Sequence, residues 1–173
     1  GKLIMECENE LAYLESVLFE LQSADSTAEL SEIKAELIAT NYLRQKVGNK
    51  KIKITAKPYE FSKNGFKILV GRNNLQNDEL TTKTAGKNDL WFHTKNIHGS
   101  HVILFTNGKE PDDDILLFAA NLAAYFSKAK NSSQVPVDYT PVKFVKKPNG
   151  AKPGMVIYTT NKTIYANPGD FKL

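Results

Sequence analysis

The chain has 173 residues, 41% of them apolar and 24% charged, which is enough for one domain with a core or for a small domain with a helical appendage. No apolar run approaches the roughly 20 residues of a membrane-spanning helix, the first residues lack a signal-peptide pattern, and a single cysteine excludes an internal disulfide. The net charge of +4 is uneven, because residues 1–50 carry −4 and residues 51–173 carry +8. The basic part suits a polyanionic partner, or is a lysine-rich solubilising surface.

The first 47 residues predict two helices. An apolar seam at spacings of three and four, typical of a coiled coil, consists of Ile4, Cys7, Leu11, Leu14, Leu18 and Leu21. This helix begins at the first residue without a cap, so we expect the chain to be a fragment. Ser26 and Glu29 form a capping-box pattern that starts a second helix near residue 27. The short connection predicts an antiparallel hairpin, either the end of a coiled coil or a plain two-helix packing element.

Residues 48–173 predict a sheet domain. A basic connector with an alternating strand pattern covers residues 48–57, and strands then flank the turn Asn64-Gly65. A short helix is expected around Leu75–Lys83, followed by strands in DLWFHTK and SHVILF that are joined by a turn. Further strands are expected in VPVDYTPVKFV and MVIYTT, on either side of the loop KKPNGAKPG.

The longest helix of this domain is expected over residues 111–130. Pro111 suits the first turn, three aspartates complement its N-terminal dipole, and Lys128 and Lys130 complement the other end. The predicted fold class is therefore α+β: an N-terminal antiparallel helical hairpin, then a mixed or antiparallel sheet packed against one long helix.

All three histidines, His93, His98 and His101, lie within nine residues. A zinc site would need converging ligands, and neither an HExxH spacing nor a second cysteine supports one. Catalysis by Ser100 and His101 fails because neighbours on a strand point to opposite faces. Two interpretations stay open: the imidazoles pack in the sheet and bond backbone groups, or they present donors and stacking faces to a nucleic acid.

The stretch GRNNLQNDELTTKTAGKNDLWFHTKNIHGSHVIL resembles the NFACT-R domain (formerly DUF814) of the RqcH/NEMF family, whose bacterial members are also called FbpA or fibronectin/fibrinogen-binding proteins. The similarity continues through AANLAAYFSKAK, VKKP and KPGMV, and the acidic hairpin resembles the end of the family's central coiled coil. The family usually has proline before Gly-Ser-His, where this chain has His98, which further weakens a three-histidine metal site.

The resemblance implies an RNA-binding module, not an enzyme, with no cofactor or metal. Family members bind large ribosomal subunits obstructed by peptidyl-tRNA and recruit tRNA, in bacteria alanyl-tRNA, so that a C-terminal tail is added to the stalled chain without mRNA. The implied partners are the large ribosomal subunit, tRNA and rRNA, in the cytoplasm and without membrane insertion. A surface adhesin for fibronectin or fibrinogen is the alternative, and a metal-assisted hydrolase is a distant third.

The candidate RNA contacts are basic and polar side chains of the motif loops and of the Pro/Gly loop. They are Arg72, Asn73, Asn74, Asn77, Asp78, Lys83, Lys87, His93, Lys95, Ser100, His101, Lys143, Lys146, Lys147 and Lys152. The asparagines and Asp78 could read RNA or only cap the short helix and its turns, and the lysines could be merely solvated. Trp91, Phe92, Tyr139 and Phe144 could stack on bases, with core packing as the competing interpretation for Trp91 and Phe92.

Overall fold

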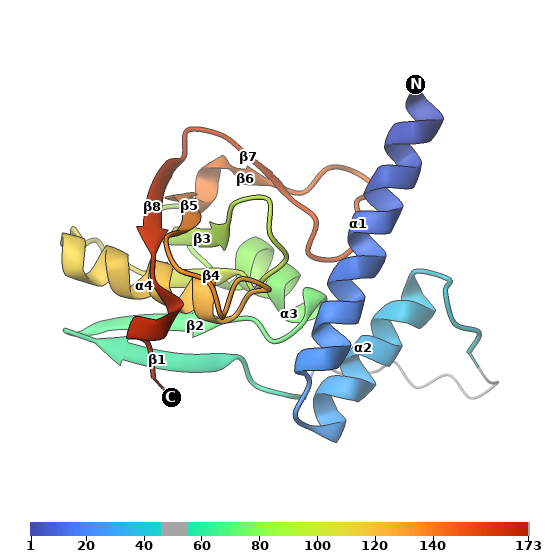
Figure 1. Cartoon of the computed structure of the whole chain (residues 1–173), viewed down its shortest axis with the longest axis horizontal. Helices are drawn as coiled ribbons and strands as arrows, with labels where there is room; N and C mark the ends of the chain where they lie inside the picture. The colour runs from blue at the N-terminus through green and yellow to red at the C-terminus, as the bar shows by residue number, and fades with distance from the viewer. Residues whose placement is uncertain (46–54, 173) are drawn as a thin grey trace.

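The computed structural model describes residues 1–45 and 55–172. The predicted α+β class is confirmed: a helical hairpin is followed by a six-stranded antiparallel sheet with one long helix on one face (Figure 1). The predicted boundary between residues 47 and 48, and most of the predicted connector, lie outside the described residues. No helix of the described part is long and apolar enough to span a bilayer.

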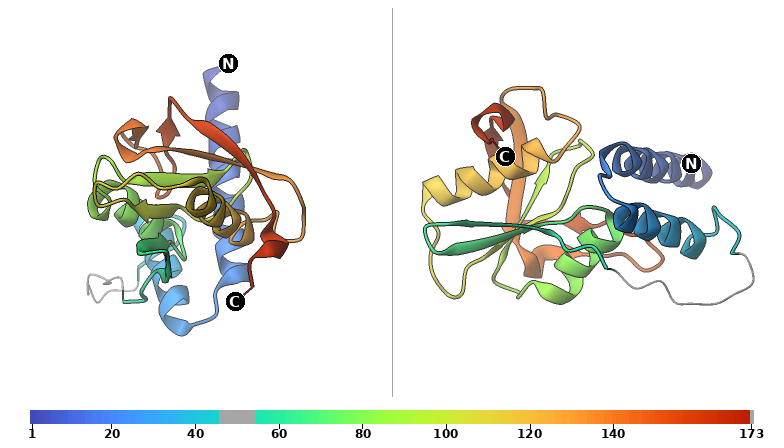
Figure 2. Two further views of the ribbon diagram at one scale, coloured as in Figure 1. Left: turned by 90° about the vertical axis from the view of Figure 1, so that its left-hand side faces the viewer. Right: turned by 90° about the horizontal axis from the view of Figure 1, so that it is seen from below.

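The hairpin consists of α1 (Lys2–Ser23) and α2 (Thr27–Ala39). Ser26 caps α2, because its hydroxyl accepts a hydrogen bond from the Glu29 amide at 3.2 Å, and the Glu29 carboxylate accepts one from the Asp25 amide at 3.0 Å. The predicted capping box is thereby confirmed. A small core of Tyr13, Val17 and Ile33 joins the two helices, which run antiparallel beside the sheet domain (Figure 2).

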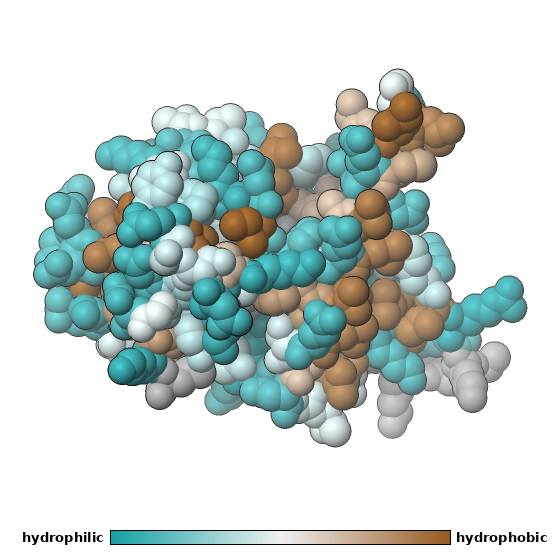
Figure 3. Space-filling model, in the orientation of Figure 1, coloured by the Kyte–Doolittle hydropathy of each residue, from teal (hydrophilic) through white to brown (hydrophobic). Residues whose placement is uncertain are grey.

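The apolar seam of α1 faces solvent. Ile4, Leu11 and Leu18 are 63%, 58% and 53% exposed, and an apolar stripe follows α1 in Figure 3. The face that α1 turns inward instead holds Tyr13, Ser16, Val17 and Glu20. The seam therefore does not join α1 to α2, and its coiled-coil interpretation stays a prediction.

The sheet has the strand order β1-β2-β4-β3-β5-β8, and every neighbouring pair is antiparallel. Its strands are β1 (Tyr59–Lys63), β2 (Phe66–Val70), β3 (Leu90–Thr94), β4 (Val102–Phe105), β5 (Val135–Pro141) and β8 (Lys162–Ala166). The predicted turn between β1 and β2 is confirmed, since Asn64 and Gly65 both have positive φ, at 49° and 80°.

Helix α4 (Asp113–Tyr125) covers one face of the sheet. Asp112 caps it by accepting a hydrogen bond from the Ile115 amide at 3.0 Å. The prediction that this helix reaches residue 130 is wrong. The Ser127 hydroxyl donates to the Ala124 carbonyl and accepts from the Ala129 amide, so the chain turns away at this point and both Lys128 and Lys130 lie beyond the helix.

The opposite face is covered by short segments. These are α3 (Asn74–Glu79), the π-helical turn η1 (Leu80–Thr84), η2 (Val142–Phe144), β6 (Val145–Lys146) and β7 (Ile157–Tyr158); η3 (Pro168–Asp170) closes the described chain. Because side chains alternate along β3, Phe92 enters the core beneath α4 while Trp91 enters a second core with Leu80 and Val142. Core packing of Trp91 and Phe92 is thus confirmed.

Candidate nucleic-acid interface

The candidate RNA contacts fall into separate environments. One set of these residues contacts the helical hairpin. A second set lies around a cavity beside the histidines, and a third set is exposed on the surface of the sheet domain. Lys95 stands apart in the β3–β4 turn, where it is exposed and its amide donates to the Pro136 carbonyl at 2.9 Å.

Arg72 joins the sheet domain to the hairpin. Its guanidinium donates to Glu29 at 2.5 Å through Nη1 and to the Lys57 carbonyl at 2.7 Å through Nε, and it lies 3.8 Å from the centroid of the Tyr59 ring. Asp25 is a weaker partner at 3.4 Å. The Arg72 side chain is 22% exposed and that of Glu29 only 3%. The planar fork predicted to grip RNA is therefore occupied within the chain, and its contact with RNA stays a prediction.

The asparagines of the motif also face the hairpin. Asn73 caps α3 through its side-chain oxygen and donates from Nδ2 to Glu32 at 2.7 Å. Asn74 donates to Ser16 at 3.1 Å and to Glu36 at 3.3 Å. Both are almost fully buried, so capping and interdomain bonding use the groups that were predicted to read bases.

Sequence reasoning missed the acidic side of this contact. Glu29, Glu32 and Glu36 recur at helical spacing on one face of α2 and are all buried, as is Glu20 of α1. We call these four glutamates, with Arg72, Asn73, Asn74 and Gln76, the polar interface. The sequence did contain a signal for this contact, because the acidic face of α2 can bond the amides and the arginine of the later motif. A row of glutamates on a helix is, however, normally expected to face solvent.

Two of these carboxyl groups have shifted acidity. Burial, followed by the charge of Glu36, raises the pKa of Glu20 well above its usual value, and burial raises the pKa of Glu36. Among the described residues, Oε2 of Glu20 and Oε1 of Glu36 have no hydrogen-bond partner. The interface therefore favours the protonated form of these two groups.

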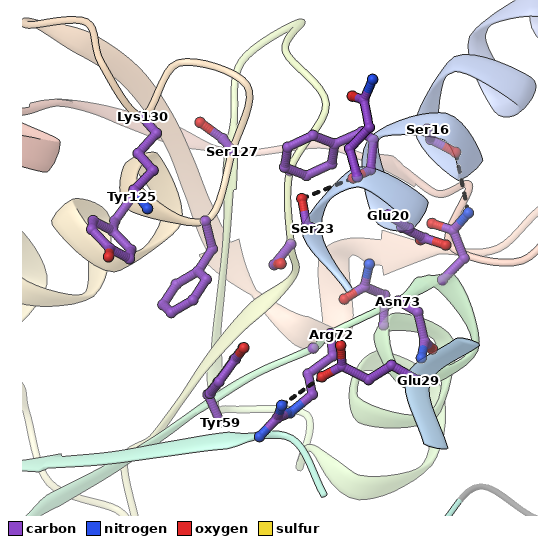
Figure 4. A pocket seen from close by; sticks show the side chains of 18 residues that line it. Ser16, Glu20, Ser23, Glu29, Tyr59, Arg72, Asn73, Tyr125, Ser127 and Lys130 are labelled. Atoms are coloured by element: carbon purple, nitrogen blue, oxygen red, sulfur yellow. Dashed lines mark hydrogen bonds and ion pairs between the residues drawn. The ribbon is translucent and has the colours of Figure 1, made fainter. Parts of the chain in front are cut away.

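A cavity of about 330 Å³ opens beside the polar interface. Figure 4 shows Glu20, Asn73 and the Arg72–Glu29 pair on one side of it and Tyr125, Ser127 and Lys130 across the space. Ser100 also lines this cavity, and its amide donates to the Phe126 carbonyl at 3.0 Å. Tyr59 offers no free face here, because Phe126 stacks on it at 4.9 Å and Arg72 covers it as well.

The Pro/Gly loop is tied back to both parts of the chain. Asp78 accepts a bond from the Gly154 amide at 2.7 Å and pairs with Lys147. The Lys152 ammonium lies 5.2 Å from the ring centroid of Tyr42 on the hairpin. Asp78, Lys147 and Lys152 thus hold the loop in place, which sets them apart from free phosphate ligands.

His93 and His101 lie close together, with ring centroids 5.6 Å apart. The buried His101 shares a hydrogen bond of 2.8 Å between Nδ1 and the Thr81 hydroxyl, and its amide donates to Asn77 at 3.1 Å. Burial lowers the pKa of His93 and lowers that of His101 to about 3, so both rings are neutral at physiological pH. Across the described residues, no group of three or more His, Cys, Asp or Glu side chains is arranged to hold a metal ion.

The remaining four lysines lie on two segments that are neighbours in the fold. Lys83 lies in η1 and Lys87 in the loop between η1 and β3. Lys143 lies in η2 and Lys146 in β6. The two segments are neighbours, since the Lys143 amide donates to the Lys87 carbonyl at 3.0 Å and both segments cover the second core. All four side chains are exposed, and none has a salt-bridge partner within the described part of the chain. We call these four residues the lysine face.

Comparison with known proteins shows that two family models match the chain. Residues 57–160 match the sequence model of the NFACT protein RNA binding domain, and residues 1–56 match that of the NFACT N-terminal and middle domains. The chain is 48% identical over 166 residues to the Rqc2 homolog RqcH of Bacillus subtilis, covering 93% of this chain and 28% of that protein. It is 47% identical over 173 residues to the corresponding protein of Streptococcus suis, covering 99% of this chain and 31% of that one.

A solved structure is also similar. It is the C-terminal part of the fibronectin/fibrinogen-binding protein from Streptococcus suis, with a TM-score of 0.87 and 48% identity, over 96% of this chain and 66% of that chain. The present chain spans less than a third of the length of the RqcH relatives described above.

Proposed function

The chain belongs to the NFACT family, which includes RqcH, and from this membership we propose that it is an RNA-binding module of a ribosome quality control factor. The observation that carries the proposal is the lysine face, four exposed cations that form no salt bridge with the described residues, on the part of the chain that matches the RNA-binding domain. Such lysines release condensed counterions when they neutralise phosphates, which favours binding to any RNA strand or helix.

The charge distribution supports the same proposal. Residues 1–50 are net negative, yet much of this charge is turned inward at the polar interface or neutralised by Arg72. The sheet domain keeps its positive charge at the surface. We infer that the hairpin orients the sheet domain and that the sheet domain contacts RNA.

The test is a salt titration with a matched control. A variant with all four lysines of the lysine face changed to alanine should bind single-stranded RNA more weakly, and the slope of log affinity against log salt should become shallower by about 0.7 per lost contact, or nearly 3 in total. The control changes Lys2, Lys34, Lys162 and Lys172 to alanine, which removes equal charge from other exposed parts of the chain. Equal losses in the two variants would contradict a defined face.

The finer assignment concerns the RNA itself. We propose that the module contacts the large ribosomal subunit and tRNA, alanyl-tRNA in a bacterium, during mRNA-independent tailing of stalled chains, and that it acts in the cytoplasm without catalysing a reaction. Co-sedimentation with purified large subunits, with and without added tRNA, tests this assignment. Binding to free RNA but not to large subunits would confine the proposal to RNA binding alone.

Fibronectin or fibrinogen binding is a second candidate. Its support is the similarity to the Streptococcus suis protein that is described as fibronectin/fibrinogen-binding. Capture of this chain on immobilised fibronectin, unchanged by loss of the lysine face, would favour the second candidate. Capture that disappears with the lysine face would instead indicate nonspecific charge attraction.

A further inference from the structure

A cavity of about 430 Å³ lies between α1, the β3–β4 turn and the Pro/Gly loop. Its walls include Trp91, His93, His98 and His101 on the sheet domain and Ala12 and Ser16 on α1. We call it the histidine pocket. It contains every histidine and the only tryptophan of the chain, and the lysine face does not line it.

The histidine pocket is lined by aromatic, amide and small side chains, and Nε2 of its His98 lies 3.2 Å from the Glu15 carboxylate of α1. No lysine, arginine, aspartate or glutamate of the described chain lines it, and the two buried imidazoles are neutral. This lining does not attract a phosphate, which needs cations or several free backbone amides. It suits a planar neutral group that offers hydrogen-bond acceptors at its edge.

The indole of Trp91 supplies an unused donor. The side chain is 1% exposed, and its Nε1 has no hydrogen-bond partner in the described part of the chain. Leaving a buried N–H unpaired costs about 1–3 kcal/mol, so such groups are rare in folded proteins. The ring centroid of His93 lies 5.6 Å from that of Trp91 in a nearly parallel stack, and the ring centroid of Tyr158 lies 4.7 Å away at a tilt of 50°, so the indole ring is fixed in place.

Cations stand outside the pocket. Lys95 precedes Asn96, which lines the cavity, and the Lys128 amide donates to the carbonyl of His98, which lines it too. Both lysine side chains are exposed. A neutral interior with cations beside it is the arrangement expected for one unstacked nucleotide, whose base enters while its phosphates stay in solvent.

We propose that the histidine pocket binds one unstacked nucleobase of single-stranded RNA, with Trp91 Nε1 donating to an acceptor on the base and the ring of His93 contacting its edge. The small side chains of Ala12 and Ser16 leave space for the base against α1, so the hairpin forms one wall of the site. This inference rests on the proposed RNA-binding function and adds a base-dependent contact to the phosphate contacts of the lysine face.

The chain carries its own reporter, because Trp91 is its only tryptophan. Octauridylate should change the Trp91 emission and bind at least about fivefold more tightly than the same strand with abasic riboses, which keeps every phosphate. The abasic strand should still bind with the salt dependence of the lysine face and leave the emission unchanged. Uridine monophosphate at high concentration should change the emission in the same direction.

Two variants test the location. Ala12→Phe fills the pocket from α1 and should abolish both the emission change and the preference for intact bases, while Ala39→Phe, at an exposed position of α2, should preserve both. Trp91→Phe keeps a ring but removes the N–H, and labelled-RNA anisotropy should show the same loss of preference. If Trp91→Phe does not fold, Ala12→Phe decides the matter.

Each alternative result overturns the proposal in a distinguishable way. Equal binding of intact and abasic strands without an emission change would refute the pocket and leave the lysine face as the RNA site. No binding of either strand at low salt, together with no response to uridine monophosphate, would refute the pocket and the proposed function together. An emission change with an aromatic tripeptide but not with RNA would assign the pocket to a protein partner.

Discussion

Changing Arg72 to methionine separates a structural role of this residue from RNA contact. The variant leaves the Glu29 carboxylate, whose side chain is only 3% exposed, without its arginine partner. Breaking one side of a buried pair costs about 3–5 kcal/mol. Since Arg72 is 22% exposed, we expect the lower limit, about 3 kcal/mol, which for a chain of this size lowers the melting temperature by roughly 6–12 °C.

The assay is urea unfolding followed by far-ultraviolet circular dichroism at neutral pH. Adding Glu29→Gln to Arg72→Met removes the buried carboxylate that has lost its partner. The free energy of unfolding of the double variant should therefore be at least about 1.5 kcal/mol higher than the sum of the two single effects predicts. Arg72→Lys keeps the charge without the planar fork and should fall between wild type and Arg72→Met. Unchanged stability of Arg72→Met, combined with a salt-sensitive loss of RNA affinity, would refute the structural role and restore Arg72 as an RNA contact.

Three further predictions concern buried groups. Glu20→Gln should raise the free energy of unfolding at pH 8 by about 1–3 kcal/mol and have little effect near pH 4. The reason is that burial raises the pKa of Glu20, so the protonated carboxyl that suits this site at low pH is lost as pH rises, while glutamine stays neutral. An equal gain from Glu8→Gln, at an exposed position, would contradict this. Burial lowers the pKa of His101 to about 3 in the folded chain, against about 6.5 in the unfolded chain. As pH falls from 6.5 towards 3, wild type should therefore lose up to about 1.4 kcal/mol of stability per pH unit relative to His101→Asn, and parallel pH profiles would be the contrary result. Gly71→Ala would bring its Cβ into a steric clash with Oδ1 of Asn77, which accepts a hydrogen bond from the His101 amide. The variant should lower the free energy of unfolding by more than about 2 kcal/mol; a thermal scan like that of wild type would contradict the close approach.

Local signals in the sequence were sufficient for most of the fold. The Asn64-Gly65 turn, the capping box at Ser26 and the alternation of Trp91 with Phe92 each depend on neighbours in the chain, so pattern and spacing determine them. The end of α4 was misplaced because a Ser127 hydroxyl bond to the backbone competes with another helical turn, and such a bond has no distinctive pattern.

The candidate site was harder to predict than the fold, because contacts between residues far apart in the sequence determine which side chains are already paired within the chain. Arg72 and Asn74 read as ligands for RNA until Glu29 and Glu36, about 40 residues earlier in the chain, are seen beside them. Conversely, Lys87 and Lys143 were assigned to different loops, and only the fold makes them neighbours. Composition predicted a basic domain, and tertiary contacts decide which of its cations remain available.

Photocrosslinking of the chain to RNA, with the linked peptides located by mass spectrometry, tests the central claim most directly. The account predicts links in the peptides that carry Lys83 and Lys87 and in those that carry Lys143 and Lys146, with few links on α1 or α2. Links concentrated on the hairpin, or on β8 with none at the lysine face, would contradict it.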